Sequence, residues 1–366
     1  MKGVILSGGK GSRLSPITDN YPKQLIPILG KPILAHCLDY MASAGIKDIA
    51  IIVGPDKGPT IEEEIKPYCK GLNVEFIYQD EPKGLAHAVG LARNFTKNED
   101  FIVLLGDNLF DKRLSDLIER FYRTQADSLI LLKDVTHPYN FGVVKFDECG
   151  KALKLVEKPK EFVSNYAIVG VYLFNQKIYQ AIDMIEPSQR GELEITDAIA
   201  LQVEQKQNIQ TQILDSYWFD TGTREGLLDA NCRMLLAENK QANLAENITE
   251  SNIFGKVNIG KESFIDRSNL MGPIYIGKNV RITNSTIGPY TSIGDNCIIE
   301  NAEIQSSIIM ENTKVLESQS ISSLVFKNTL MQKENMNISK LIMKPSEIKL
   351  FASVKPQYLN SNNHAA

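Results

Sequence analysis

A repeat of about seventeen residues restricts the fold of this chain more than any other feature of its sequence. Three copies are plain: IGKESFI starts at residue 259, IGKNVRI at 276 and IGDNCII at 293. Weaker copies, IMENTKV, VFKNTLM and IMKPSEI, start at 309, 325 and 342. Six residues after its start each copy has an apolar residue, namely Ile265, Ile282, Ile299, Val315, Met331 and Ile348. A six-residue apolar step inside this period predicts three short strands per coil of a solenoid.

These copies resemble the hexapeptide-repeat family, whose fold is a left-handed parallel β-helix. The resemblance implies that residues 241–350 form such a helix of about six coils. Because they are polar, residues 351–366 are expected to form a flexible tail. We expect the β-helix to serve as a structural and oligomerisation module, because its outer faces can pack against another subunit. The chain is therefore expected to form a homo-oligomer.

The first 240 residues follow a different pattern, in which short β-branched runs alternate with segments of helical spacing. Helical patterns are expected at 31–45 and 84–95. Buried strands are expected at 3–6, 49–53, 74–78, 101–105, 128–132 and 170–174. This alternation predicts an α/β domain over residues 1–240, with a Rossmann-like, mostly parallel sheet. Ligands of such sheets bind at the carboxyl ends of the strands.

Charge and cysteine usage narrow the setting of the protein. The net charge of −4 gives no overall attraction to nucleic acid or to an acidic membrane, so any anion site must be local. The five cysteines are scattered without a CxxC pair, which indicates reduced thiols. No apolar run is long enough for a signal peptide or a membrane span. We expect a cytoplasmic protein that binds neither nucleic acid nor membranes.

A glycine-rich loop, LSGGKGSRL, follows the first predicted strand. It does not match the dinucleotide fingerprint, because Leu14 stands where the third glycine of that motif belongs. It does not match the P-loop either, because Lys10 is followed by Gly11 and not by Ser or Thr. Adjacent glycines let backbone N–H groups approach a phosphate, and an arginine adds a bidentate partner. A tight turn without a ligand is the alternative. The residues expected to bind phosphate are Gly8, Gly9, Gly11, Ser12 and Arg13.

The segment YPKQLIPILGKPIL then places Lys23 and Gln24 between prolines. Together with the loop, it resembles the sugar-nucleotide pyrophosphorylases, nucleotidyltransferases that join a sugar 1-phosphate to a nucleoside triphosphate. Ser12 stands where that family usually has Thr, and it keeps the hydroxyl group. The resemblance implies that Lys23 reaches the phosphates undergoing transfer and that Gln24 helps to bind the nucleotide.

Later segments are similar to the long-form glucose-1-phosphate thymidylyltransferases, which append a β-helix. YQDEPKGLAHAV resembles their base-recognition segment, which implies that Gln79 and Gly84 contact a pyrimidine. LLGDNLF and YWFDTGT supply Asp107 and Asp220, and the resemblance implies that these two carboxylates hold one Mg²⁺. Asp107 is also expected to contact the nucleotide. His87 stands where the short forms usually have Gln, and we expect it to pack or to support the site rather than to catalyse.

The sugar phosphate is expected to bind at segments that resemble the family's sugar-binding pair, NFGVV and LVEKP. This implies that Gly142 and Glu157 contact sugar hydroxyls and that Lys158 neutralises the sugar phosphate, with Gly170 in the same group. SQRGELEITDAI completes the family's set of motifs. Its acidic residues Glu192, Glu194 and Asp197 are expected to cap a helix and to favour its dipole rather than to bind metal.

The resemblance implies direct, Mg²⁺-dependent transfer of a nucleotidyl group from dTTP to glucose 1-phosphate. Arg13, Lys23 and Lys158 would act by positioning and electrostatics. UTP is an open alternative to dTTP, because a glutamine reads both bases alike. A catalytically silent regulatory homologue is another. Acyl transfer by the β-helix is disfavoured, because such chemistry commonly uses a histidine and the only one after residue 137 is His364.

Overall fold

The computed structural model describes residues 1–9, 11–111, 113–238, 247–332 and the strand at 342–343. Its contacts divide the chain into two units. The first unit comprises Met1–Arg13, Thr18–Ile26 and Pro32–Gly222. The second unit comprises Leu14–Ile17, Pro27–Lys31 and the chain from Thr223 onward. The contacts therefore divide the chain before residue 240, because helix α9 (Arg224–Ala237) groups with the second unit.

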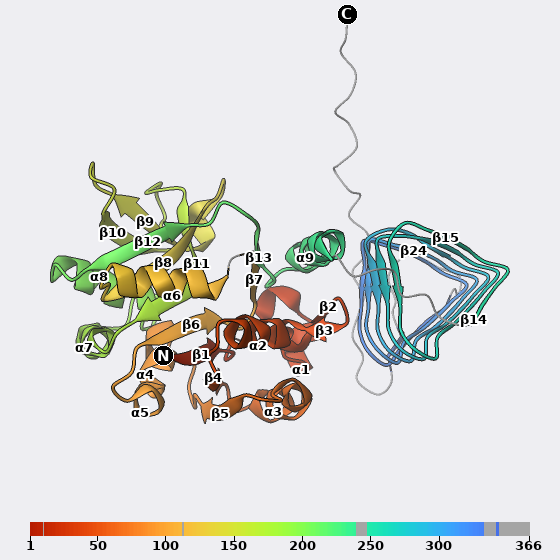
Figure 1. The fold of residues 1–366 in the computed structure, drawn as a ribbon, viewed down its shortest axis with the longest axis horizontal. Helices are drawn as coiled ribbons and strands as arrows, with labels where there is room; N and C mark the ends of the chain where they lie inside the picture. Colours follow the sequence, from red (N-terminus) through yellow and green to blue (C-terminus); the bar gives the residue numbers. More distant parts are fainter. Residues whose placement is uncertain (10, 112, 239–246, 333–341, 344–366) are drawn as a thin grey trace, which may run out of the picture. The chain divides into compact units, whose positions relative to one another are not determined.

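A nine-stranded sheet forms the centre of the first unit within the described residues, in the order β10-β9-β11-β6-β1-β4-β5, with β8 beside β11 and β12 beside β8. Strand β11 runs against β6, β8 and β9, and β10 runs against β9, so the other strands share one direction. The predicted mostly parallel sheet is confirmed (Figure 1). Its strands are β1 (Lys2–Leu6), β4 (Asp48–Val53), β5 (Asn73–Tyr78), β6 (Phe101–Leu105), β8 (Ser128–Asp134), β9 (Gly142–Phe146), β10 (Ala152–Glu157), β11 (Tyr166–Phe174) and β12 (Ile209–Ile213).

Helices cover both faces of this sheet. One apolar core joins alternate strand residues, such as Val4, Ala50 and Val103, to α4, α7 and α8. On the other face, α6 contacts β8 and β11, and α2 packs against α6. The helices of this unit are α2 (Ile33–Ser43), α3 (Gly58–Ile65), α4 (Leu85–Leu91), α5 (Arg93–Thr96), α6 (Leu114–Arg123), α7 (Lys177–Met184) and α8 (Ile195–Glu204). The helical patterns expected at 31–45 and 84–95 correspond to α2 and to α4 with α5.

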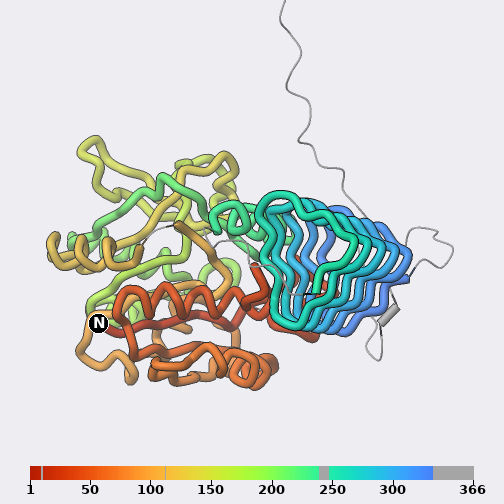
Figure 2. The backbone as a smooth tube through the Cα atoms, turned by 45° about the vertical axis from the view of Figure 1, so that its right-hand side comes forward, coloured from red at the N-terminus to blue at the C-terminus, as the bar shows by residue number. Residues whose placement is uncertain are grey.

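Short parallel strands in three sheets form most of the second unit, in agreement with the predicted left-handed β-helix (Figures 1 and 2). Five complete coils and the first strand of a sixth lie within the described residues. The first sheet contains β14 (Asn247–Thr249), β17 (Phe264–Asp266), β20 (Arg281–Thr283), β23 (Ile298–Glu300), β26 (Lys314–Leu316) and β29 (Thr329–Gln332). The second contains β15 (Asn252–Phe254), β18 (Asn269–Met271), β21 (Thr286–Ile287), β24 (Glu303–Gln305) and β27 (Gln319–Ile321). The third contains β16 (Val257–Ile259), β19 (Ile274–Ile276), β22 (Thr291–Ile293), β25 (Ile308–Ile309) and β28 (Leu324–Val325).

The predicted repeat positions coincide in space. Ile265, Ile282, Ile299, Val315 and Met331 are paired in register from coil to coil. The first four of them are fully buried. The column begins one coil earlier than expected, at Ile248, which pairs with Ile265. These side chains form the core of the solenoid.

An asparagine stands at the same turn of successive coils and helps to explain why the repeat folds this way. Asn279, Asn296 and Asn312 all have positive φ, between +53° and +58°, a conformation that asparagine tolerates better than most residues. Their side chains form a ladder, because Asn279 Nδ2 donates to Asn296 Oδ1 at 2.9 Å and Asn296 Nδ2 donates to Asn312 Oδ1 at 3.1 Å. The fourth residue of the repeat thus fixes the turn.

The repeat copy that starts at 342 does not continue the parallel coil, so the prediction of a coil there is wrong. Strand β30 (Ile342–Met343) runs antiparallel to β29. This copy has no glycine, and it carries Pro345, which has no N–H group for a ladder hydrogen bond. Ile348 and the tail predicted at 351–366 lie outside the described residues.

Asn231 of α9 is a buried junction within the second unit. Its Nδ2 donates to the Tyr290 carbonyl at 3.2 Å. Its Oδ1 accepts from Ser292 Oγ at 2.6 Å and from the Leu29 N–H at 3.4 Å. One amide therefore joins α9, the β-helix and the segment Pro27–Lys31, which contains strand β2 (Pro27–Ile28).

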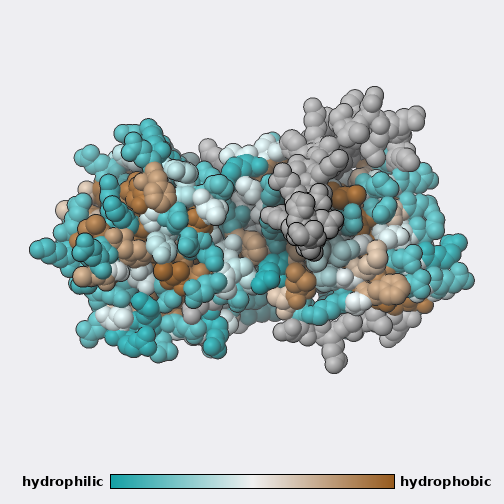
Figure 3. All heavy atoms as spheres, turned by 90° about the horizontal axis from the view of Figure 1, so that it is seen from above, coloured by the Kyte–Doolittle hydropathy of each residue, from teal (hydrophilic) through white to brown (hydrophobic). Residues whose placement is uncertain are grey.

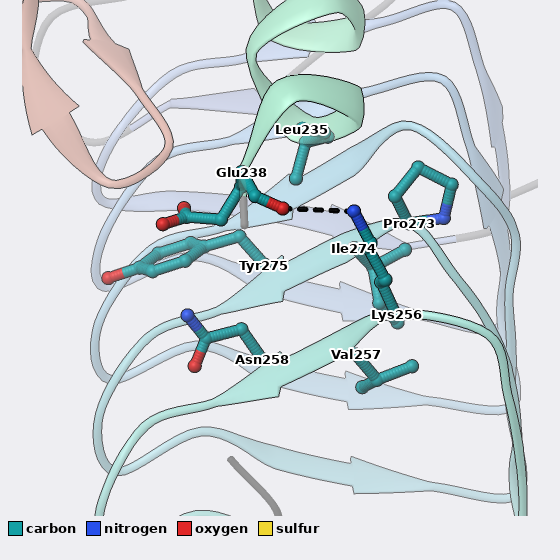
Figure 4. Close-up of a pocket in the computed structure, with 8 residues that line it drawn as sticks. All are labelled: Leu235, Glu238, Lys256, Val257, Asn258, Pro273, Ile274 and Tyr275. Atoms are coloured by element: carbon teal, nitrogen blue, oxygen red, sulfur yellow. Dashed lines mark hydrogen bonds between the residues drawn. The ribbon is translucent and has the colours of Figure 1, made fainter. Parts of the chain in front are cut away.

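A small pocket lies between the C-terminal end of α9 and the first coils (Figure 4). The Lys256 side chain lines one side of the pocket, and its Nζ donates to the Glu238 carbonyl at 3.0 Å. Its volume of about 20 Å³ has room for roughly one water molecule. None of the site residues predicted from the sequence lines it.

The surface seen in Figure 3 carries scattered apolar side chains among polar ones. Two exposed apolar residues of the β-helix, Phe254 and Met271, are register neighbours on β15 and β18.

None of the helices in the described part of the chain combines the length and apolar character that a membrane crossing needs.

Candidate active site

A large cavity of the first unit lies at the carboxyl ends of its parallel strands. The segments that follow β1, β4 and β5 line a cavity of about 690 Å³, together with residues 18–20 and Gln24. Four residues predicted to bind the nucleotide, Gly8, Gly9, Ser12 and Gln24, are in this lining. The structure therefore places the glycine loop where ligands of parallel α/β sheets bind.

The glycines of the loop allow it to lie directly against its neighbours. A Cβ atom added to Gly8 would lie 3.2 Å from Gln79 Oε1, and one added to Gly9 would lie 3.4 Å from Lys23 Cε. Gly11 has a φ of +76°, and its carbonyl accepts a hydrogen bond from Thr18 Oγ1 at 2.6 Å. A side chain at Gly8 would crowd the Gln79 amide, whereas a Cβ atom at Gly9 would make an ordinary contact with Lys23.

Gln24 is almost fully buried, and its side chain holds the backbone at Ser7, directly after β1. Its Nε2 donates to the Ser7 carbonyl at 3.1 Å. The amide nitrogen is thus engaged by the backbone directly before the glycine loop. Gln24 lines the cavity, but its hydrogen bond indicates a role in shaping the loop, in addition to the nucleotide contact that the sequence predicts.

The two predicted metal carboxylates are brought to neighbouring positions by a short antiparallel pair, β7 (Asn108–Phe110) and β13 (Trp218–Asp220), in which Asp220 lies opposite Asn108. Thr221 strengthens the pairing, because its N–H and its hydroxyl both donate to the Asp107 carbonyl, at 3.2 and 2.6 Å. Residues from distant parts of the sequence therefore meet beside the glycine loop.

Each carboxylate is paired with one of the predicted phosphate-binding cations. Lys23 Nζ donates to Asp107 Oδ2, and both side chains are largely buried. Arg13 Nη2 donates to Asp220 Oδ2 at 3.0 Å in a more exposed setting. The arrangement alternates two cations and two carboxylates, a pattern that can bind an anion and a cation side by side.

The donor set of this site fits Mg²⁺. The described residues contain no cluster of three or more His, Cys, Asp or Glu side chains suited to a metal. Mg²⁺ does not require such a cluster, because it is usually held by one or two carboxylates, substrate phosphates and water. Asp107 and Asp220 supply hard oxygen ligands of this kind.

The predicted base-recognition residues form a second group. Gln79 follows β5 and is 6% exposed. Its Nε2 lies 3.4 Å from the Gly84 carbonyl oxygen and 2.9 Å from His87 Nδ1. Gly84 has a φ of +103°, and a Cβ atom there would lie 2.4 Å from the Leu193 carbonyl oxygen. Only glycine fits this position, and His87 contacts the site through Gln79.

The predicted sugar-binding residues form a third group around Glu157. Gly142 lies opposite Glu157 in the β9–β10 pair, and a Cβ atom there would lie 2.9 Å from Glu157 Oε2. Lys158 Nζ lies 3.9 Å from Glu157 Oε1. Two residues that sequence reasoning missed complete the group: Thr196 Oγ1 donates to Glu157 Oε2 at 3.1 Å, and Arg190 Nη1 lies 3.6 Å from Oε1.

Burial raises the pKa of Glu157, although Lys158, Thr196 and Arg190 act in the opposite direction. Burial also raises the pKa of Glu194, and the charge of Glu157 adds to this effect. Two carboxyl groups near one another thus have weakened acidity. A sugar hydroxyl bound to Glu157 would meet a carboxyl group that is poorly solvated and open to a hydrogen bond.

The acidic run at 192–197 only partly behaves as the sequence predicts. Asp197 lies in the first turn of α8, where its charge favours the helix dipole. Glu194 occupies the N-cap position but its side chain makes no cap hydrogen bond. It accepts from Ser188 Oγ at 3.0 Å and pairs with Arg190 at 3.2 Å, so the capping prediction for Glu194 is wrong. The Glu194 carboxylate therefore pairs with Arg190 and does not accept from the first N–H groups of α8.

Gly170 lies at an irregularity of β11 and has a φ of +76°. A Cβ atom there would lie 2.6 Å from Asn108 Nδ2. Asn108 directly follows Asp107, and its Oδ1 accepts from Trp218 Nε1 at 3.1 Å. Gly170 therefore packs against the strand pair that positions the carboxylates, and its assignment to the sugar phosphate stays a prediction.

Several polar residues of the cavity carry no motif that sequence reasoning could use. They come from α1 (Ile17–Asn20) and from the segments after β4 and β5, and they include Asp19, Asn20, Asp56, Lys57 and Asp80. For Asp56, Lys57 and Asp80 the available signal was their position shortly after predicted parallel strands. Position alone does not select which polar residues of a loop face a cavity.

Comparisons with known proteins agree on one family. The profile of the nucleotidyl transferase family matches residues 2–239. The chain is 38% identical over 269 residues to the low-salt glycan biosynthesis nucleotidyltransferase Agl11 of Haloferax volcanii, covering 72% of this chain and 74% of that protein. It is also 38% identical over 264 residues to a glucose-1-phosphate thymidylyltransferase of Streptomyces antibioticus, covering 71% and 73%.

A UTP–glucose-1-phosphate uridylyltransferase of Haloferax volcanii, AglF, is 34% identical over 236 residues and covers 64% of this chain and 96% of its own. Among solved structures, one described as a glucose-1-phosphate thymidylyltransferase from Bacillus anthracis in complex with sucrose superposes with a TM-score of 0.60. It is 34% identical and covers 67% of this chain and 98% of its own.

Proposed function

The chain belongs to the nucleotidyl transferase family and is a sugar-1-phosphate nucleotidyltransferase, and we propose that it transfers a thymidylyl group from dTTP to glucose 1-phosphate. The products are dTDP-glucose and pyrophosphate. The observation that carries the proposal is the pairing of Arg13 with Asp220 and of Lys23 with Asp107 beside the glycine loop. These four side chains suit a triphosphate with its metal.

The chemistry is a direct displacement at the α-phosphorus of dTTP. An oxygen of the sugar phosphate forms a bond to that phosphorus while the bond to the β-phosphate oxygen breaks, and pyrophosphate leaves with the electron pair. The sugar phosphate is already anionic, so no protein nucleophile or strong base is needed. The enzyme has to hold the groups in line and offset their negative charge.

The residues of the site supply those two contributions. Backbone N–H groups of the glycine loop and the Arg13 guanidinium hold the triphosphate. Lys23 neutralises the phosphates that react, and Lys158 neutralises the sugar phosphate, while Glu157 and Gly142 bind sugar hydroxyls. Arg13 and Lys23 exchange their carboxylate partners for phosphate oxygens when dTTP binds, so their charges are kept in position beforehand.

Asp107 and Asp220 would hold Mg²⁺. The bound ion would reduce the repulsion between the triphosphate and the sugar phosphate. The two carboxylates otherwise repel the substrates, so their presence beside a phosphate site supports this assignment. The presence of both carboxylates favours a catalyst over a silent regulatory homologue, because such homologues typically lose the metal carboxylates.

We also propose that the protein forms a homo-oligomer through its β-helix. The exposed apolar pair Phe254 and Met271 on one outer face supports this proposal. Molar mass measured by light scattering tests it. The expected result is two or more times 40.9 kDa, and a monomer at assay concentrations would contradict it.

UTP is the second candidate donor, because the uridylyltransferase AglF is among the similar proteins and the base contact at Gln79 suits uracil as well as thymine. Pyrophosphate release measured with dTTP, UTP, dCTP, ATP and GTP against several sugar 1-phosphates distinguishes the candidates. We expect the highest kcat/KM for dTTP with glucose 1-phosphate. Activity with purine nucleotides alone would contradict the assignment of Gln79 and Gly84.

A further inference from the structure

We propose that His87 sets the base specificity by holding the Gln79 amide in one orientation, with its oxygen turned toward the bound base. In this orientation the site selects a pyrimidine that carries a hydrogen on N3, as thymine and uracil do and cytosine does not. The inference rests on the proposed function and adds a positioning residue to it.

Two neighbours determine which end of the Gln79 amide points where. The Gly84 carbonyl oxygen lies 3.4 Å from Gln79 Nε2, and a carbonyl only accepts hydrogen bonds. The same nitrogen lies 2.9 Å from His87 Nδ1, which must then be the acceptor. His87 therefore carries its proton on Nε2. Both N–H groups of the amide are engaged by the protein.

The remaining atom of the amide faces the loop. Gln79 Oε1 lies 3.2 Å from the place that a Cβ atom would take on Gly8, and Gly8 lines the large cavity. Gln79 is 6% exposed, so water offers this oxygen little compensation. The carbonyl oxygen is the part of Gln79 left to read the base. Of the hydrogen-bonding groups on a pyrimidine, this oxygen can pair only with a donor such as N3–H.

The chemistry of the bases converts this orientation into a preference. N3 of thymine and uracil donates a hydrogen bond to Oε1. N3 of cytosine is an acceptor, so two lone pairs would face each other in a poorly hydrated site. A site built to pair with one donor rejects an analogue that lacks it far more strongly than a site that reads shape.

The surroundings of His87 keep its Nδ1 available as an acceptor. Burial lowers the pKa of His87, Lys83 acts in the same direction, and Glu81 opposes both. His87 lies on α4, the helix whose N-cap residue is Gly84. One turn of helix therefore carries both groups that hold the Gln79 nitrogen.

The test compares His87→Ala and His87→Gln with the unaltered enzyme. The measurement is kcat/KM for dTTP, UTP and dCTP by pyrophosphate release at saturating glucose 1-phosphate. His87→Ala should lower the preference for dTTP over dCTP by about tenfold or more, while the dTTP to UTP ratio and the KM for glucose 1-phosphate stay the same. His87→Gln restores an acceptor and should return the preference to within about threefold of the original.

A third variant keeps the inference testable if His87→Ala does not fold. His87→Lys offers only donors, so Gln79 should turn its oxygen toward the lysine and its nitrogen toward the base. The preference for dTTP over dCTP should then fall at least as far as in His87→Ala. An unchanged preference in either variant, or a loss in His87→Gln as large as in His87→Ala, would overturn the inference. If the unaltered enzyme uses no pyrimidine nucleotide, the proposed function itself fails, which is a separate outcome.

Discussion

Replacing Gly84 by alanine tests whether close approach, and not only backbone freedom, requires glycine at the predicted base site. Gly84 has a φ of +103°. A Cβ atom there would lie 2.4 Å from the oxygen and 2.7 Å from the nitrogen of Leu193. The Leu193 backbone is held in place, because its N–H donates to the Lys83 carbonyl at 2.7 Å and its carbonyl accepts from the Ala86 N–H at 3.0 Å. The new methyl group must separate these segments.

The expected loss follows from two contributions. A non-glycine residue in this backbone conformation costs about 1–3 kcal/mol. Losing the two backbone hydrogen bonds costs roughly 1 kcal/mol each. The free energy of unfolding should fall by about 3–5 kcal/mol in Gly84→Ala. Gly71 is the matched control, because it has a φ of +81° and nothing within 4 Å of its added Cβ atom. Gly71→Ala should cost only about 1–2 kcal/mol.

Urea unfolding followed by the fluorescence of Trp218 measures both variants, since this single tryptophan lies in the same unit as both glycines. Gly84→Ala should also raise the KM for dTTP, because the Gly84 carbonyl contacts the Gln79 amide. Equal losses of stability in the two variants would refute the reasoning, because backbone conformation alone would then account for the glycine.

Three further predictions follow from the site and the second unit. Asp107→Asn and Asp220→Asn should each lower kcat on the order of 10²-fold in Mg²⁺, and near-normal turnover in both would contradict the carboxylate assignment. Asn231→Ala should lower the stability of the second unit by about 2–4 kcal/mol, since three hydrogen bonds of a fully buried amide are lost. Ser292→Ala, which removes one of them, should cost about a third as much in thermal unfolding. Because the pKa of Glu157 is raised, the stability that its proton provides is lost as the pH rises through the folded-state pKa. Glu157→Gln should therefore gain stability relative to the unaltered protein from acidic to neutral pH, and a constant difference in urea unfolding would count against the raised pKa.

The sequence predicted the parts of the fold whose signals are local. The runs at 3–6, 49–53 and 101–105 became β1, β4 and β6, because consecutive β-branched residues buried on both faces have few other uses. The seventeen-residue period predicted the β-helix, because each coil repeats one local pattern and this pattern is visible in the sequence. The copy at 342 shows the limit, because similarity of apolar spacing does not ensure that the next strand pairs in parallel.

The site was predictable only where a motif marked it. Gly8, Gly9 and Ser12 stand in a recognisable loop, whereas Thr196 and Arg190 reach Glu157 only through the packing of α8 and the segment before it. The pairing of β7 with β13 depends on strands far apart in the chain, and no local pattern specifies it. The bond from Gln79 to His87 likewise depends on how the β5–α4 segment folds back.

Isotope transfer tests the central claim, nucleotidyl transfer to a sugar 1-phosphate at the α-phosphorus. Glucose 1-phosphate labelled with ¹⁸O in its non-bridging phosphate oxygens is incubated with dTTP and Mg²⁺, and the products are analysed by ³¹P NMR. We predict dTDP-glucose with ¹⁸O in the bridge between its two phosphorus atoms and pyrophosphate without label. Absence of a nucleotide sugar, or a product without label in the bridge, would contradict the proposed reaction.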